Sequence, residues 1–277
     1  MKTQQRKTIV EDISIRGIGV FCGEIINVKL SPANCGEGIR IIRTDIPNDN
    51  IFPVNRFAEF ETNHLNTTIS NGINSVKLIE HLISAIWCFK ITDINIYIDH
   101  DEIPMLDGSA KDWIKLLGST NIKTFDEVIA CKYIKNEMEV KTEDKYIIAK
   151  PCDHLKITYT IDFPERTIGK NTFIFDELLN SYGKELMLAR TFCTEAQVEN
   201  HKKIKKAFST NDIVIYNDNG FRVTGNQLRY SNEATRHKVL DLIGDLTSTG
   251  DFICGEFTCY KSGHAMNREI IKLIYQD

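Results

Sequence analysis

The clearest hydrophobic pattern in the chain lies at residues 235–246 and predicts a helix. Its apolar residues recur at intervals of three and four, and no proline interrupts them. His237, Asp241 and Asp245 follow one another at intervals of four, so they form one polar ridge on an otherwise apolar helix. Because burying carboxylates without partners is costly, the ridge is either a solvated face or part of a site that supplies those partners.

Other helices are predicted wherever the same spacing recurs. The segment 76–89 has a broad apolar face and a candidate N-cap in Ser75. A turn at 101–109 leads into a short helix that extends through Leu117. The remaining predicted helices are 176–179, a polar helix after Thr191, and 264–275. Helices are therefore expected in both halves of the chain.

Strands are predicted where apolar and polar residues alternate or β-branched residues cluster. Residues 7–30 contain two such runs joined by a glycine-rich bend; further strands are predicted at 39–43, 94–98, 146–149, 155–161, 173–175, 213–216 and 252–259. The periodicity lapses near 124–128, between two strand-rich blocks. We therefore expect an α+β fold of two domains of related plan, residues 1–126 and 127–277, with a site in the cleft between them.

Composition places the chain among globular proteins. Of its 277 residues, 42% are hydrophobic and 26% charged, which is enough apolar material for a sizeable core. The formal net charge of −4 gives no reason to expect nucleic acid as a partner. Residues 1–21 lack the apolar core of a signal peptide, and no apolar run reaches the roughly 18 residues of a spanning helix. The eight cysteines include no Cys-x-x-Cys pair, so we expect a reducing, cytoplasmic location.

A metal site is the sharper interpretation of the polar ridge. His237 and Asp241, at positions i and i+4, suit Zn²⁺, or Fe²⁺ in the same kind of site, with Asp245 supporting them. His81, in the middle of an apolar helical segment, would complete a His₂Asp set and leave one coordination position open for water. Glu80 beside it would then be the general base. The alternative is that His81 is a satisfied core histidine or a boundary residue.

Further residues have both a structural and a chemical interpretation. His264 opens the last predicted helix; it is either a simple helix-start residue or an imidazolium that Asp245 holds as a general acid. Thr191 is either an N-cap or a hydroxyl that donates to a developing oxyanion. Four basic residues form a solvated face or, less simply, a contact for a membrane or an anionic lipid precursor: Lys202, Lys203, Lys205 and Lys206.

Several stretches, taken together, resemble one protein family. They are 78–82 (Leu-Ile-Glu-His-Leu), 101–110 (Asp-Glu-Ile-Pro-Met-Leu-Asp-Gly-Ser-Ala), 161–163 (Ile-Asp-Phe), 189–192 (Ala-Arg-Thr-Phe), 236–246 (from Arg-His-Lys to Asp-Leu) and 261–265 (Lys-Ser-Gly-His-Ala). In this order they resemble the UDP-3-O-acyl-N-acetylglucosamine deacetylases of Gram-negative bacteria, the zinc amidases that commit carbohydrate to lipid A. The likeness covers nearly all of the chain, and the combination is specific although each motif alone is weak.

The resemblance implies a fold and a metal centre. The fold is two α+β domains, each a β-sheet with packed helices, with the active site between the helix layers. The zinc ligands are implied to be His81, His237 and Asp241. The resemblance makes Glu80 the general base.

The resemblance also implies the remaining roles at the site. It makes His264 the acid, supported by Asp245, and Thr191 the donor to the oxyanion. Substrate contacts are implied for Lys238, Phe192 and Phe163, the last of them beside the uracil.

Three positions depart from the family pattern. The family usually has His at the position of Phe21 and Gly at that of Cys193. The segment 206–210 lacks the paired glycines that are common there. All three bear on how the substrate and its acyl chain bind, whereas the metal-binding residues are intact.

The expected reaction is hydrolysis of the acetamide of UDP-3-O-acyl-N-acetylglucosamine, which gives acetate and the 2-amino sugar nucleotide. The alternatives are deacetylation of another N-acetyl sugar or amide, and a non-catalytic metal-binding or lipid-sensing protein. Metal binding alone does not need Glu80, His264 and Asp245, so their joint presence favours the enzyme. We expect a monomer that binds a UDP-sugar substrate and contacts a membrane at most peripherally.

Overall fold

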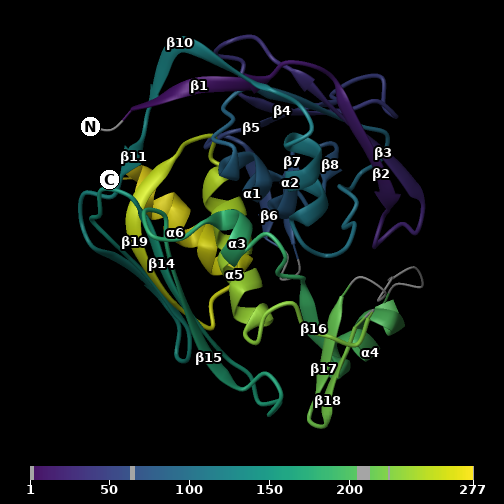
Figure 1. Cartoon of the computed structure of the whole chain (residues 1–277), viewed down its shortest axis with the longest axis vertical. Helices are drawn as coiled ribbons and strands as arrows, with labels where there is room; N and C mark the ends of the chain where they lie inside the picture. Colours follow the sequence, from purple (N-terminus) through teal and green to yellow (C-terminus); the bar gives the residue numbers. More distant parts are fainter. Residues whose placement is uncertain (1–2, 63–65, 205–212, 224, 277) are drawn as a thin grey trace.

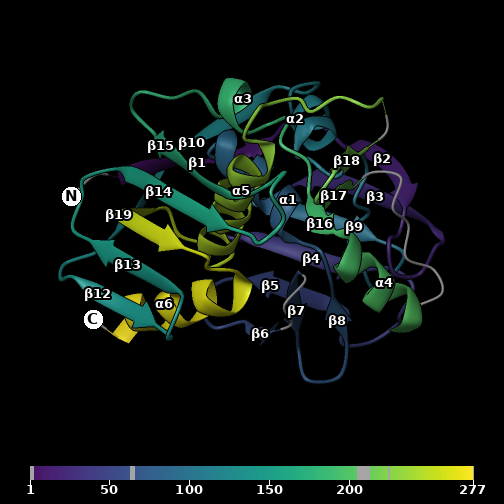
Figure 2. The same cartoon turned by 90° about the horizontal axis from the view of Figure 1, so that it is seen from below.

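Two large β-sheets enclose a layer of helices (Figures 1 and 2). The computed structural model describes residues 3–62, 66–204, 213–223 and 225–276. The fold is of the predicted α+β class. Along the strands that face the helices, every second side chain is buried: Ile26, Val28 and Leu30 in one sheet, and Ile157, Tyr159 and Ile161 in the other. The core therefore lies between the sheets.

The first sheet has the strand order β2-β3-β9-β4-β5. Its strands are β2 (Ile13–Ile18), β3 (Ile25–Pro32), β9 (Ile94–Ile98), β4 (Ile39–Arg43) and β5 (Ile51–Val54). Strand β9 pairs antiparallel with β3 and parallel with β4. The predictions for β4 and β9 are confirmed to the residue, because both are short β-branched runs with clear ends.

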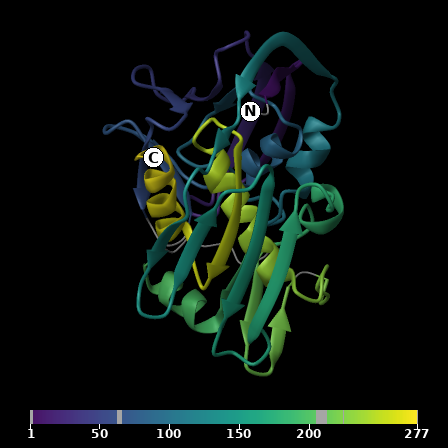
Figure 3. The same ribbon diagram turned by 90° about the vertical axis from the view of Figure 1, so that its left-hand side faces the viewer.

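The second sheet repeats this plan with the order β12-β13-β19-β14-β15. Its strands are β12 (Met138–Lys141), β13 (Tyr146–Lys150), β19 (Ile253–Tyr260), β14 (Leu155–Asp162) and β15 (Lys170–Asp176), with β11 (Lys132–Tyr133) beside one end of β19. Strand β19 pairs antiparallel with β13 and parallel with β14, as β9 does with its neighbours. Figure 3 shows β19, in yellow, running between teal strands of this sheet. The two halves therefore share one topology.

The helices occupy matching places in the two halves. Helix α1 (Glu80–Cys88) precedes the central strand β9 and α2 (Lys111–Leu117) follows it. In the second half α5 (Glu233–Thr247) precedes β19 and α6 (His264–Gln276) follows it. Helices α1 and α5 pack against each other in the middle of the molecule. The two helices that carry the predicted metal ligands are therefore neighbours.

Each half also carries an insertion before its central helix. In the first half it is the sheet β6 (Glu59–Thr62), β7 (Thr67–Ser70) and β8 (Ser75–Val76). In the second half it comprises α3 (Tyr182–Glu185), β16 (Phe192–Thr194), α4 (Glu195–Ile204), β17 (Val214–Asn217) and β18 (Gly220–Arg222). The strands β16, β17 and β18 form their own sheet, which Figure 1 shows as a green lobe beside the helices.

Two of the predicted helices are placed differently by the structure. Residues 76–89 are not one helix: Ser75 and Val76 form β8, Leu78 has a φ of 61°, and α1 begins at Glu80. Backbone hydrogen bonds tie Lys77 to Asp101 and Ile103, so the chain is held extended there. Of the residues 176–179, Asp176 ends β15 and 177–179 form a turn, and the short helix α3 comes later.

The strand pair β1 (Thr3–Ile9) and β10 (Ile122–Ala130) is antiparallel and links the start of the chain to its middle. The expected boundary after residue 126 falls inside β10, and the division into domains 1–126 and 127–277 stays a prediction. Among the residues that the structure describes, no helix has both the length and the apolar composition to cross a membrane.

Candidate active site

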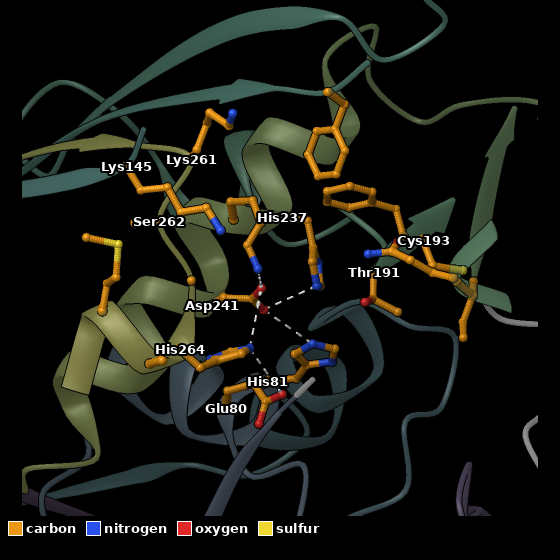
Figure 4. Close-up of a pocket in the computed structure, with 18 of the residues that line it drawn as sticks. Glu80, His81, Lys145, Thr191, Cys193, His237, Asp241, Lys261, Ser262 and His264 are labelled. Carbon is orange, nitrogen blue, oxygen red and sulfur yellow. Dashed lines mark hydrogen bonds and ion pairs between the residues drawn. The ribbon is translucent and has the colours of Figure 1, made fainter. Parts of the chain in front are cut away.

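The three predicted metal ligands meet between α1 and α5. Nε2 of His237 lies 3.2 Å from Oδ1 of Asp241, and Nε2 of His81 lies 3.6 Å from the same oxygen. One ligand atom from each residue lies within 4.8 Å of the other two, and all three residues are buried (Figure 4). The structure thus brings together a His₂Asp triad from two helices far apart in the sequence.

A glycine allows the two helices to approach this closely. Gly244 lies on α5, three residues after Asp241. A Cβ atom added to Gly244 would stand 2.3 Å from the carbonyl oxygen of Glu80, the residue before His81. Because backbone cannot yield as a flexible side chain does, only glycine fits at this crossing of α1 and α5. Gly244 therefore sets the distance between the helices that carry the triad.

The triad fits a divalent cation. Nδ1 of His237 donates a hydrogen bond to the carbonyl oxygen of Ala189 at 3.0 Å, which leaves Nε2 with a free lone pair beside Asp241. Oδ1 of Asp241 is buried and accepts no hydrogen bond from the described residues. A buried carboxylate oxygen without a donor is costly, and a cation between it and the two imidazoles would satisfy it. Although burial opposes ionisation, the neighbouring charges, that of Lys238 among them, hold the pKa of Asp241 well below its usual range.

Glu80 and His264 flank the triad in the same cavity. Oε2 of Glu80 accepts a hydrogen bond from the backbone N–H of Thr67 at 3.0 Å. Oε1 of Glu80 lies 4.0 Å from Nε2 of His264, and the same nitrogen is 4.0 Å from Oδ2 of Asp241. Burial raises the pKa of Glu80 against the opposing effects of His264 and His81. The carboxylate of Glu80 and the imidazole of His264 could therefore both contact a small group bound at the triad.

Asp245 orients His264 from the side away from the triad. Its Oδ2 lies 2.8 Å from Nδ1 of His264, so that nitrogen carries a proton and donates it. Burial lowers the pKa of His264, but the charge and hydrogen bond of Asp245, with Glu80 and Asp241 adding to them, raise it to about 9. His264 is therefore an imidazolium at neutral pH, as a general acid must be.

The network around Asp245 includes residues that the sequence reasoning missed. Asp245 also accepts hydrogen bonds from the hydroxyl of Thr67 and from Nδ2 of Asn267, the latter at 2.8 Å, and Nη2 of Arg268 lies 3.6 Å away. Asn267 and Arg268 follow His264 by three and four residues on α6, a helical spacing that the sequence does display. Thr67 lies in a short strand of the first insertion, and no pattern in the sequence marks it.

Thr191 lines the cavity without capping a helix. Its backbone N–H donates to the carbonyl oxygen of Gly108 at 2.7 Å, and its carbonyl accepts from Val214 at 3.0 Å. Strand β16 follows it directly, and α4 begins only at Glu195. The interpretation of Thr191 as an N-cap is therefore wrong, and its hydroxyl is available to the cavity that Figure 4 shows.

The cavity above the triad has a volume of about 770 Å³. Lys238, Phe192 and Phe163 line it, and the rings of Phe163 and Phe192 pack edge to face with their centres 5.5 Å apart. The departures Phe21 and Cys193 line it as well. One side is apolar, where Cys193 packs in a cluster with Val20, Leu78, Val198, Ile213 and Ile215. The cavity therefore offers both aromatic and aliphatic surface next to the triad.

The basic residues predicted to form a solvated face or a membrane contact lie largely outside the described part of the chain. Lys205, Lys206 and the rest of the segment 206–210 lie outside the described residues. The side chains of Lys202 and Lys203, on the last turn of α4, lie outside them too. The role of this basic segment stays a prediction.

Comparisons with known proteins cover the whole site. A family model described as LpxC, UDP-3-O-acyl N-acetylglycosamine deacetylase, matches residues 6–276. A UDP-3-O-acyl-N-acetylglucosamine deacetylase of Psychrobacter sp. (strain PRwf-1) is 32% identical over 277 residues, covering 99% of this chain and 93% of that protein. A protein of the same name from Leptospira biflexa serovar Patoc (strain Patoc 1 / Ames) is 32% identical over 279 residues, covering 97% and 89%. The matches include both halves of the fold.

Proposed function

The chain belongs to the UDP-3-O-acyl N-acetylglycosamine deacetylase family, and we propose that it hydrolyses the N-acetyl group of UDP-3-O-acyl-N-acetylglucosamine in the cavity between α1, α5 and α6. The products are UDP-3-O-acyl-glucosamine and acetate, and the step commits the sugar nucleotide to lipid A. One observation carries the placement of the reaction: Glu80 and His264 flank a buried His₂Asp triad. A base and an acid beside a metal site are what amide hydrolysis needs, because the amine must leave protonated.

The family is one of metalloenzymes, and His81, His237 and Asp241 are the residues that hold the ion. Zn²⁺ suits two imidazoles and one carboxylate, and Fe²⁺ suits the same donors. When bound, the ion supplies Lewis acidity toward the acetamide carbonyl and acidifies water. The free lone pair on His237 and the unsatisfied oxygen of Asp241 support this proposal.

Glu80 removes the proton from the attacking water. Thr67 holds one carboxylate oxygen of Glu80 through its backbone N–H, so the other oxygen is left for the water. Burial raises the pKa of Glu80, which makes it a stronger base than an exposed glutamate. The oxygen of the water bonds to the acetamide carbon, and the proton passes to Glu80.

His264 supplies the proton that the leaving nitrogen needs. As the C–N bond breaks, the electron pair goes to nitrogen, which takes the proton from Nε2 of His264. Asp245 keeps the opposite nitrogen, Nδ1, protonated, so the acidic proton lies on the side of the cavity. The overall change adds water across the amide bond and releases acetate and an amine.

Thr191 and three further residues bind the substrate in this proposal. The hydroxyl of Thr191 donates to the oxyanion that forms on the carbonyl oxygen. Lys238 contacts the polar part of the substrate, and Phe192 and Phe163 supply aromatic surface, the latter beside the uracil. The edge-to-face pair of these two rings at the cavity wall supports a shared role in holding a planar or apolar group.

We further propose a cytoplasmic enzyme that acts as a monomer, binds no nucleic acid and contacts a membrane at most peripherally. The main alternative function is that of a metal-dependent deacetylase of another N-acetyl sugar or amide. A non-catalytic metal-binding or lipid-sensing protein would use the triad but would have no need of the Asp245–His264 pair. Turnover of the acylated sugar nucleotide distinguishes these three functions.

Amine release from UDP-3-O-acyl-N-acetylglucosamine tests the proposal. The purified protein is assayed as isolated, after chelation, and after adding Zn²⁺ back from sub-stoichiometric to equimolar amounts. We expect activity to be lost on chelation and restored at one equivalent. The same assay on the non-acylated sugar nucleotide separates the proposed substrate from other N-acetyl sugars. No release from the acylated substrate, despite one tightly bound ion, would contradict the proposed reaction.

A further inference from the structure

A buried ion pair lies beside the proposed metal ligands without touching them. Arg190 precedes Thr191, and Glu233 opens α5, one helical turn before His237. Nε of Arg190 donates to Oε1 of Glu233 at 2.8 Å and Nη2 donates to Oε2 at 3.2 Å. The side chain of Arg190 is 5% exposed and that of Glu233 is 0%. The reaction described above uses neither side chain.

Both carboxylate oxygens of Glu233 also accept hydrogen bonds from the backbone. Oε1 also accepts the backbone N–H of Arg190 at 3.0 Å, and Oε2 accepts the backbone N–H of Arg229 at 2.7 Å. Nη2 of Arg190 donates in addition to the carbonyl oxygen of Gln227 at 2.8 Å. The pair therefore fastens the segment 189–191 to the start of α5 and to the loop before it.

The residues on either side of Arg190 act directly at the site. The carbonyl oxygen of Ala189 accepts the Nδ1–H of His237 and so selects the tautomer and ring orientation of that ligand. Thr191, on the other side, presents its hydroxyl to the cavity. A shift of Arg190 would move both the carbonyl that orients His237 and the hydroxyl at the oxyanion position.

A second set of contacts holds the same segment from the first half of the chain. The carbonyl oxygen of Gly108 accepts the N–H of Thr191 at 2.7 Å. Nη2 of Arg229 lies 2.8 Å from Oδ2 of Asp107, and its Nη1 donates to the carbonyl oxygen of Leu188 at 3.1 Å. The motif 107–109, which the reaction itself does not use, thus supports Thr191 through the backbone. Arg229 joins this support to Glu233.

We propose that Arg190 and Glu233 are positioning residues of the active site, which set the orientation of His237 through Ala189 and the placement of Thr191. The inference rests on the proposed function for the role of Thr191, but not for the orientation of His237. Charged, bidentate pairing suits this purpose, because two parallel hydrogen bonds fix both distance and angle. A neutral contact of similar size would hold the segment less rigidly.

Glu233→Gln tests the proposal, with Asp93→Asn as the matched control. Asp93 is also 0% exposed; it pairs with Arg6 at 2.9 Å and accepts the backbone N–H of Gly38 at 2.8 Å, but it does not line the cavity. Both substitutions keep the size of the side chain and remove one buried charge from an arginine pair. Thermal unfolding, the dissociation constant for Zn²⁺, the visible spectrum of the Co²⁺ form, and kcat and KM are measured for each.

We expect both variants to unfold at lower temperature, but only Glu233→Gln to change the site. A lost partner of a metal-binding histidine weakens metal binding by about 10- to 100-fold. Misplacement of a reacting group by about 1 Å lowers kcat by about 100-fold. The Co²⁺ spectrum of Glu233→Gln should differ from that of the wild type while its KM changes little. Asp93→Asn should leave the spectrum, the dissociation constant and kcat at their wild-type values.

Arg190→Lys provides an independent variant, because it keeps the charge and the backbone hydrogen bond but loses the paired hydrogen bonds that the guanidinium donates to Glu233. It should change the same measurements less than Glu233→Gln does. Wild-type spectra, metal affinity and kcat in both variants, with only the unfolding temperature lowered, would overturn the proposal. If the wild-type protein itself releases no amine, the proposed function fails, while the spectrum and dissociation constant still decide whether the pair orients His237.

Discussion

Helices α1 and α5 hold equivalent places in the two halves, yet they contribute differently to the site. Each precedes the central strand of a five-stranded path with the same order and directions. Helix α1 carries its only acidic and imidazole groups, Glu80 and His81, in its first turn. Helix α5 carries a ridge over two turns, from His237 through Asp241 to Asp245. One topology therefore supports two helices, of which α1 carries the proposed base and one proposed metal ligand and α5 carries the other two proposed ligands.

The loops that follow the two central strands extend this comparison. The loop after β19 leads into α6 and places His264 at the triad as the proposed acid. The equivalent loop after β9 leads toward α2, and there Gly108 holds the backbone of Thr191 instead of reacting. Loops in the same place of the shared topology thus carry the proposed acid in one half and a backbone support for Thr191 in the other.

The largest effects should separate the contributions of the two helices. His237→Ala should lose the metal and all turnover, because α5 then offers one ligand. Glu80→Gln should keep the metal and lower kcat by about 10²- to 10⁴-fold, as expected for loss of a general base. Metal content after gel filtration and kcat are measured for both variants. Equal metal loss in the two would break the assignment of α1 to base chemistry.

The next effect concerns the acid on α6 and its support on α5. The carboxylate of Asp245 helps to raise the pKa of His264 to about 9, against burial, so the charged form of the acid is present below that pH. Activity should therefore fall as pH rises through this region. His264→Gln should lower kcat by about 10²-fold and remove this alkaline limb.

Asp245→Asn sharpens the same test. Without that carboxylate the charged imidazole is less favoured, so the alkaline limb should move to lower pH. The kcat–pH profiles of the wild type and the two variants are compared. An alkaline limb that stays at the same pH in all three would rule out His264 as the acid.

A smaller effect should come from the crossing of α1 and α5. Gly244→Ala places a methyl group against the carbonyl of Glu80, so the helices must separate. Overpacking of this kind costs about 1–3 kcal/mol of unfolding free energy. Metal affinity should fall as well, because His81 moves away from Asp241.

Gly183→Ala is the control for this helix crossing. Gly183 lies in helix α3, and a Cβ there would meet only the Oγ of Ser181, at 3.9 Å. Urea unfolding and metal titration of the two variants are compared. Similar losses of metal affinity in both would show that contact between α1 and α5 does not set the site.

The smallest effect should lie at the cavity wall. Phe163→Leu removes an aromatic ring from the cavity wall. An aromatic contact is worth about 0.5–1.5 kcal/mol, so loss of the proposed contact with the substrate should raise KM by about 2- to 12-fold with kcat unchanged. Phe221→Leu is the control, since that ring packs on Tyr216 away from the cavity. Steady-state kinetics distinguish them. An unchanged KM in Phe163→Leu would remove this residue from the proposed substrate contacts.

The sequence by itself determined the features that depend on local spacing. The helix predicted at 235–246, which the structure extends to 233–247, and the proximity of His237 to Asp241 follow from helical spacing. Strands β4 and β9 follow from compact β-branched runs. The α+β class follows from the mixture of both patterns. The meeting of His81 with His237 and Asp241 was also predicted, because His81 stood out as an imidazole in an apolar segment.

Only the tertiary structure decided the features that depend on distant partners. The start of α1 is set by the pairing of Lys77 with 101–103, which local helical spacing does not contain. Thr67, the carbonyl of Ala189 and the close approach at Gly244 act across intervals of tens to hundreds of residues. The spacing of hydrophobic residues along a chain indicates whether one segment is a helix or a strand. Contacts between segments arise from the packing of many side chains at once. Helices α5 and α6 could therefore be predicted from the sequence, but the start of α1 and the contacts that orient the groups at the site could not.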